Sequence, residues 1–63
     1  MREALPNLKE ALQREELVLE ALDEAYNQGK LEYLFYSPAR DATGARAAAL
    51  SFAVDRLEAA AAP

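Results

Sequence analysis

Large apolar residues recur at helical spacing in the first half of the chain. Intervals of four, seven, three and four residues separate Leu8, Leu12, Leu19, Leu22 and Tyr26, which therefore form a stripe along one face of a helix. Three smaller apolar residues widen this stripe, namely Ala11, Val18 and Ala25. Asn7 suits an N-cap, Glu10 completes a capping box, and Leu5 is placed for a hydrophobic staple. Gly29 stands where a left-handed C′ residue belongs. The pattern predicts an amphipathic helix over 7–28.

The next segment, 31–36, is rich in aromatic residues and alternates in a different way. Leu31, Tyr33 and Phe35 alternate with Glu32, Leu34 and Tyr36, which fits a short strand of period two. Two turns of helix also fit, because periodicity does not separate strand from helix over so short a run. We favour the extended structure, since Gly29 precedes the segment and Ser37-Pro38 follows it. A lone strand would have to pair with a twin chain or with the sheet edge of a target.

Ser37-Pro38 predicts the start of a second helix, with Ser as N-cap and Pro at the first helical position. The remainder of the chain contains eleven Ala, so its helix propensity is high. Its apolar face is expected to consist of Leu50, Ala53, Val54, Leu57 and Ala61. Gly44 disfavours the early part, so regular helix is expected only from 41–43 onward, after a looser turn.

These elements predict a mainly α fold. Two antiparallel helices, at about 7–28 and 38–61, would be joined by the extended or strand-like segment 31–36, and residues 1–63 would form a single small domain. Folding a chain of this size costs on the order of 90 kcal/mol of conformational entropy, close to what its core can return. Stability must therefore come from helix propensity, from a second chain, or from both.

Composition narrows the chemistry. The chain has no Cys and no His, which removes disulfides, thiolate nucleophiles and imidazole chemistry. Its net charge of −4 argues against nucleic acid as a partner, and no apolar run is long enough to span a membrane. No signal-peptide pattern opens the sequence, so we expect a soluble protein whose location the sequence does not define.

Neither a metal site nor a catalytic site is expected. The predicted first helix carries a charge of −4 and places four carboxylates at bundle-like spacing, namely Glu16, Glu20, Asp23 and Glu24. Di-metal bundles also use His ligands, so a solvated acidic face is the favoured interpretation. Ser37, Thr43 and Ser51 are not in a nucleophile motif and have no His as a base. We therefore expect a non-enzyme without cofactor.

Several apolar residues lie outside the predicted core. Phe52 lies about 200° from Leu50 on a helical wheel, and Leu17 lies about 140° from Leu12. Scattered surface apolar residues are normal in soluble proteins. Phe52 and Leu17 occur together with an aromatic segment, however, and this combination favours a contiguous partner-binding patch, because Tyr and Phe are enriched at interface hot spots. The predicted patch is Leu17, Tyr33, Leu34, Phe35, Tyr36 and Phe52.

The sequence resembles computationally designed mini-protein binders. The resemblance is spread over the chain and includes charged residues at positions expected to be exposed. Helix-capping signals occur at Asn7…Glu10 and Ser37-Pro38. Ala-dense runs occur at Ala45-Arg46-Ala47-Ala48-Ala49-Leu50 and Leu57-Glu58-Ala59-Ala60-Ala61-Ala62-Pro63. It implies a rigid helical scaffold that presents a hot-spot patch to a target protein. Gly44 and the lone strand depart from that style. The alternative is a natural small α-helical homodimeric regulatory protein, bacterial or phage, whose dimer interface is the same patch.

Overall fold

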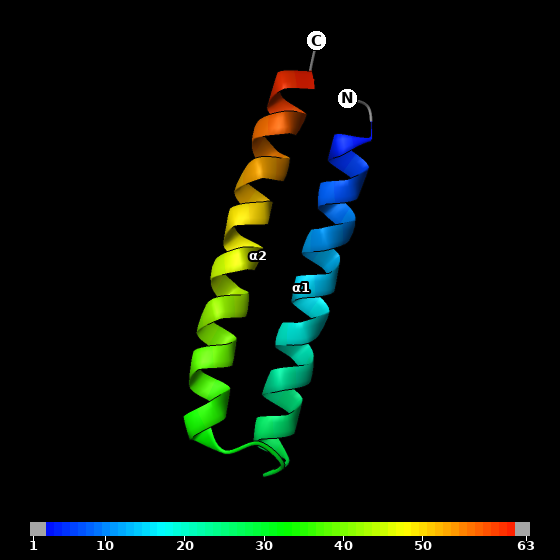
Figure 1. The fold of residues 1–63 in the computed structure, drawn as a ribbon. Coiled ribbons are helices and arrows are strands. Elements are labelled where there is room, and N and C mark those ends of the chain that lie inside the picture. Colours follow the sequence, from blue (N-terminus) through cyan, green and yellow to red (C-terminus); the bar gives the residue numbers. More distant parts are fainter. Residues whose placement is uncertain (1–2, 62–63) are drawn as a thin grey trace.

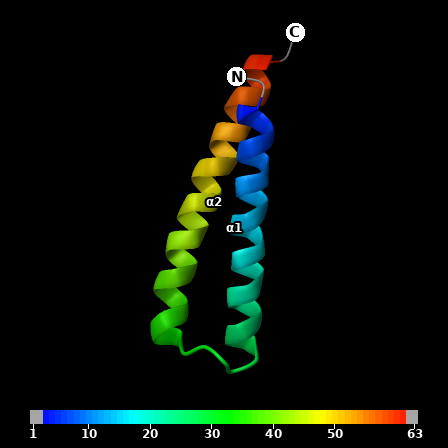
Figure 2. The same cartoon turned by 45° about the vertical axis from the view of Figure 1, so that its right-hand side comes forward.

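The computed structural model describes residues 3–61, which form two long helices. Helix α1 spans Ala4–Asn27 and helix α2 spans Tyr33–Ala61. The helices run antiparallel, side by side along their whole length, with the connecting loop at one end and both termini at the other (Figures 1 and 2). The hairpin measures 48 × 15 × 14 Å. The expectation of a mainly α, two-helix fold is confirmed.

Helix α1 begins earlier than its capping signals predicted. The backbone N–H of Asn7 donates to the Glu3 carbonyl at 3.0 Å, which is the first bond of the helical ladder. Asn7 and Glu10 therefore lie inside α1, and Leu5 lies in its first turn rather than outside it as a staple. Pro6 permits this early start, because proline in the first turn lacks only an N–H that would have had no helical acceptor.

Helix α1 ends where the position of Gly29 predicted its end. Gly29 has a φ of +73°, in the left-handed region. Its N–H donates to the Tyr26 carbonyl at 3.0 Å, and the N–H of Lys30 donates to the Ala25 carbonyl at 2.9 Å. These two bonds are the Schellman motif, which uses carbonyls that the helix end leaves without partners. The chain then turns within five residues into α2.

The strand-like interpretation of 31–36 is wrong. The N–H groups of Phe35 and Tyr36 both donate to the Glu32 carbonyl, at 3.0 and 2.9 Å, so the aromatic residues form the first turn of α2. No strand is present in residues 3–61. The alternation of side chains was compatible with both structures, and the strong helix propensity of the following Ala-rich sequence extends the helix toward the loop.

Ser37-Pro38 does not start α2, and there is no loose turn after it. Both residues lie in the second turn, and Pro38 is the sixth residue of the helix. Pro38 has no N–H to donate to the carbonyl of Leu34, so the ladder lacks one bond there. Gly44 is also helical, with nothing within 4 Å of the position where a Cβ would stand. Helix α2 is therefore continuous through both residues that were expected to delay it.

The two helices bury very little between them. Val54, 6% exposed, is the buried apolar residue among residues 3–61, and Thr43, 3% exposed, is the buried polar one. Leu50 and Ala53 are half-buried as expected, whereas Leu57 is 38% exposed and is not a core residue. Over the described chain, neither helix combines the length and hydropathy that crossing a bilayer requires. A hairpin this thin leaves most of its apolar side chains in contact with solvent.

Candidate protein-interaction surface

The first turn of α2 displays three large apolar side chains to solvent. Tyr33, Leu34 and Phe35 are 65%, 73% and 60% exposed. Successive residues of a helix point about 100° apart, so the three side chains fan out around the start of α2. We call Tyr33, Leu34, Phe35 and the adjoining Tyr26 and Tyr36 the loop-end cluster.

Aromatic stacking between the helices holds this cluster. The rings of Tyr26 in α1 and Tyr36 in α2 stack at 4.3 Å between centroids with an interplanar angle of 15°. Tyr33 packs obliquely against both, with centroids 6.1 Å from Tyr26 and 6.5 Å from Tyr36. Sequence reasoning placed Tyr26 in the core stripe and missed this role. Its position at the end of that stripe, three residues before Gly29, was the available signal.

A polar triad fixes the same end of the hairpin. The Tyr36 hydroxyl donates to Asp23 Oδ1 at 2.6 Å, and Arg40 Nε donates to the same oxygen at 3.0 Å. The hydrogen bond from Tyr36, followed by that from Arg40 and its charge, lowers the pKa of Asp23, although partial desolvation opposes the shift. The Asp23 carboxylate in turn raises the pKa of Tyr36, with desolvation acting in the same direction. The hydrogen bond and charge of Asp23 also raise the pKa of Arg40. Tyr36 therefore positions the helices against each other.

A second polar group lies at the middle of the hairpin. Arg46 Nε donates to Glu15 Oε1 at 2.6 Å, and Arg46 Nη2 donates to Thr43 Oγ1 at 3.2 Å. The Glu15 side chain is only 19% exposed. Glu15 follows Leu12 by three residues and precedes Leu19 by four, so it occupies an inward position of the stripe. Polar residues at inward positions fix helix register at a cost in stability.

The six residues predicted as one patch do not form one. Tyr33, Leu34 and Phe35 lie together at the loop end, while Tyr36 is half-buried against Tyr26. Phe52, 66% exposed, lies on α2 eighteen residues beyond Leu34, about 27 Å along the helix. Leu17, 56% exposed, lies on α1 and, by its helical phase, faces away from α2.

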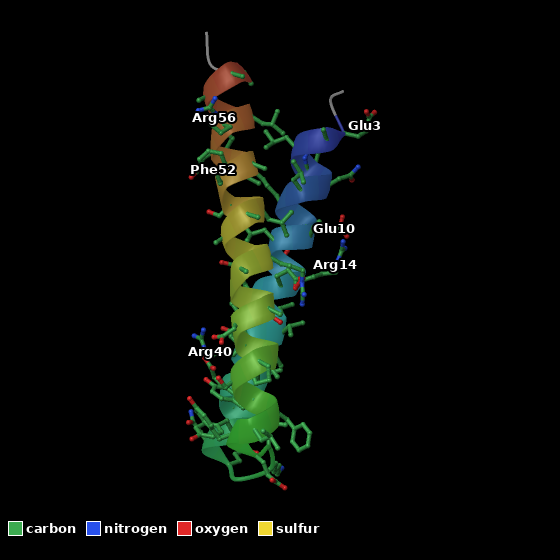
Figure 3. The ribbon with its side chains drawn as sticks, turned by 60° about the vertical axis from the view of Figure 1, so that its left-hand side comes forward. Glu3, Glu10, Arg14, Arg40, Phe52 and Arg56 are labelled. Carbon is green, nitrogen blue, oxygen red and sulfur yellow. The ribbon has the colours of Figure 1, made fainter. Side chains whose placement is uncertain are left out.

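Phe52 lies in surroundings that differ from those of the loop-end cluster. It points away from α1, on the outer side of α2, with Arg56 one turn further along (Figure 3). The guanidinium carbon of Arg56 is 5.8 Å from the ring centroid, a cation–π contact. The loop-end cluster and the Phe52 region are therefore two separate apolar surfaces.

The acidic face of α1 shows no ligand geometry. Within the described part of the chain, no group of three or more Asp or Glu side chains is placed to hold a metal ion. Asp23 is bound by Tyr36 and Arg40, and Glu24 accepts a hydrogen bond from the Gln28 amide at 3.1 Å. These carboxylates therefore serve intramolecular contacts.

We compared the chain with known proteins in three ways. No family model, no curated protein and no solved structure matches the chain.

Proposed function

We propose that the chain is a non-catalytic protein-binding module that docks on a target protein through the loop-end cluster. The observation that carries the proposal is the exposure of Tyr33, Leu34 and Phe35, each at least 60% exposed on one helical turn. Exposing large apolar side chains to water is unfavourable in free energy, and covering them with a partner contributes favourably to binding.

Contacts between the two helices hold the tyrosines of the cluster in place, which favours tight binding. The Tyr26–Tyr36 stack and the bonds to Asp23 hold the turn from two helices at once. A surface that is ordered before binding loses less entropy when it docks. A helical scaffold that carries a preformed aromatic surface is also what the resemblance to designed binders implies.

The composition of the chain favours a binding role over a catalytic one. The chain contains neither Cys nor His, and its buried hydroxyl residue, Thr43, accepts a hydrogen bond from Arg46. Its apolar surfaces are therefore the functional candidates.

Site-directed photo-crosslinking tests the proposal. A benzophenone amino acid is placed at Leu34 or, as a control, at the exposed polar residue Gln13, in cells that produce the protein. The proposal predicts one discrete adduct with a protein of different mass from position 34 and none from position 13. Adducts only with the chain itself, or equal adducts from both positions, contradict it.

The purified partner then allows a matched measurement. Leu34→Asp removes the apolar side chain but places an acid in the first turn of α2, where it favours the helix. We expect Leu34→Asp to weaken partner binding by about tenfold or more, and Gln13→Asp to leave it unchanged. Equal affinities for the two variants contradict docking at the loop-end cluster.

A further inference from the structure

The outer side of α2, turned away from α1, carries a face that is apolar at its centre and charged at its two ends. Its residues recur at spacings of three and four, which puts them on the side of α2 turned away from α1. All of them are exposed, namely Asp41, Ala45, Ala48, Ala49, Phe52 and Arg56. Between Asp41 and Asp55 the only charged residue of α2 is Arg46, which is bound to Glu15. We call these six residues the outer α2 face.

We propose that the outer α2 face binds the same face of a second copy of this chain in antiparallel orientation. The two-fold axis would pass between Ala48 and Ala49. In that register Ala48 lies opposite Ala49 of the second copy, and Phe52 lies opposite Ala45 of the second copy. The side chains complement each other in size, because each Phe52 projects over a small residue and alanines let two helix backbones approach closely.

Charge complementarity selects the antiparallel register. The same register brings Asp41 opposite Arg56 of the second copy, once at each end of the contact. Among residues 3–61 neither Asp41 nor Arg56 forms a salt bridge within the chain, and the guanidinium of Arg56 lies over the Phe52 ring. A parallel pairing in register would place Asp41 beside its own copy and Arg56 beside its own copy, which is repulsive.

The elongated hairpin exposes more surface than a compact chain of the same mass would. The chain exposes 4898 Å². A compact folded chain of this mass exposes about 4,000 Å². The surplus of about 900 Å² is close to the roughly 800 Å² that each partner buries in a standard protein–protein interface.

Single cysteines test the pairing directly, because the parent chain has none. Two cysteines bridge only when their Cα atoms come within about 7 Å. In the antiparallel pair, residues 48 of the two copies lie beside the axis, whereas residues 59 lie about 30 Å apart along the helices. Ala48→Cys is therefore expected to form a disulfide dimer rapidly under mild oxidation, and Ala59→Cys and the α1 control Ala21→Cys are not.

Each other outcome overturns the proposal. Rapid dimers from both Ala48→Cys and Ala59→Cys indicate parallel pairing, and equal, slow dimer formation from all three variants indicates random collision. A parent chain that sediments as a 6.9 kDa monomer up to about 300 µM also contradicts it, since an interface of standard size associates well below that concentration.

Charge exchange tests the register independently. Arg56→Asp and Asp41→Arg are each expected to weaken self-association about tenfold, because each places like charges opposite one another twice in the dimer. The double variant Asp41→Arg/Arg56→Asp is expected to restore it. Arg14→Asp on α1 changes the net charge as Arg56→Asp does and is the control for that variant. Failure of the double variant to recover contradicts the antiparallel pairing.

The inference is independent of the proposed docking at the loop end. Leu34 lies about 22 Å along α2 from the proposed axis, so Leu34→Asp is expected to leave self-association unchanged. Phe52→Ala is expected to weaken self-association about tenfold or more, because it removes two interface anchors at once. Its circular-dichroism spectrum should stay helical, since Phe52 is 66% exposed in the hairpin. A Phe52→Ala chain that self-associates like the parent contradicts the inference.

Discussion

The Tyr36 hydroxyl donates a 2.6 Å hydrogen bond to the Asp23 carboxylate, joining α2 to α1 across thirteen residues of sequence. This bond links the stability of the hairpin to pH at both ends of the scale. The pKa of Asp23 lies below its ordinary value of 3.8, so its contribution is complete above that pH and is lost as the pH falls through the lowered pKa. The pKa of Tyr36 lies above 10.0, so its contribution is complete below pH 10.0 and is lost as the pH rises through the raised pKa.

Tyr36→Phe is expected to remove this linkage while keeping the ring stack on Tyr26. Without the donor, the pKa of Asp23 moves back toward 3.8, although Arg40 still lowers it. Carboxyl carbon titration by NMR measures the shift directly. Tyr33→Phe is the matched control, because Tyr33 makes ring contacts with Tyr26 and Tyr36. An Asp23 pKa that is equal in the parent and in Tyr36→Phe contradicts the bond.

Ser37→Ala and Pro38→Ala report where α2 begins. With the start at Tyr33, Ser37→Ala is expected to change stability by no more than about 0.5 kcal/mol, because Ser37 does not act as a cap. Pro38→Ala is expected to stabilise by about 1–3 kcal/mol, since it restores an N–H to the ladder and removes a steric clash. Urea denaturation measures both. A loss of about 1 kcal/mol in Ser37→Ala would instead be the signature of a lost N-cap at that residue.

The two glycines are expected to respond to alanine with opposite signs. Gly29→Ala places a Cβ at a φ of +73° and should destabilise by about 1–2 kcal/mol. Gly44→Ala lies in open space inside α2 and should stabilise by about 1 kcal/mol. In a chain of about 60 residues each kcal/mol shifts the melting temperature by roughly 4–8 °C, so thermal melts resolve both effects. Shifts of the same sign contradict the backbone geometry of at least one glycine.

Val54 and Leu57 were both expected in the core, and of the two the structure buries only Val54. Val54→Ala removes two methyl groups from the most buried apolar position and should cost about 2 kcal/mol. Leu57→Ala should cost only about 1 kcal/mol, because Leu57 is 38% exposed. Val18→Ala, at an exposed position on α1, is the control and should stay within about 0.5 kcal/mol of the parent. A larger loss at Leu57 than at Val54 contradicts the packing.

The sequence predicted the features that depend on local preference over many residues. The α1 stripe was long enough for its period to identify a helix, and Gly29, whose φ is positive, marked its end. The helix starts were wrong, because Asn7 and Ser37 are good caps that the helices extend past. Single capping residues contribute about 1 kcal/mol, which continuous helix on the N-terminal side can exceed.

The loop-end cluster could be predicted only in part. Its aromatic content was visible, and it drew attention to Tyr33, Leu34 and Phe35. The stack of Tyr36 on Tyr26 and the bond to Asp23 depend on how α2 is placed along α1, which the five-residue turn sets. Phe52 and Leu17 were correctly placed outside the core, but the wheel alone did not show that they lie far from the cluster.

The exposure of Tyr33, Leu34 and Phe35 depends on the helical start of α2. NMR of the labelled chain measures this start through Cα secondary shifts over residues 31–38 and through contacts between the Hα of residue i and the N–H of residue i + 3. The structure predicts positive helical Cα shifts from Tyr33 onward and a contact from Tyr33 Hα to the Tyr36 N–H. Negative Cα shifts over 31–36, with helical contacts beginning only after Pro38, would show that α2 does not begin at Tyr33.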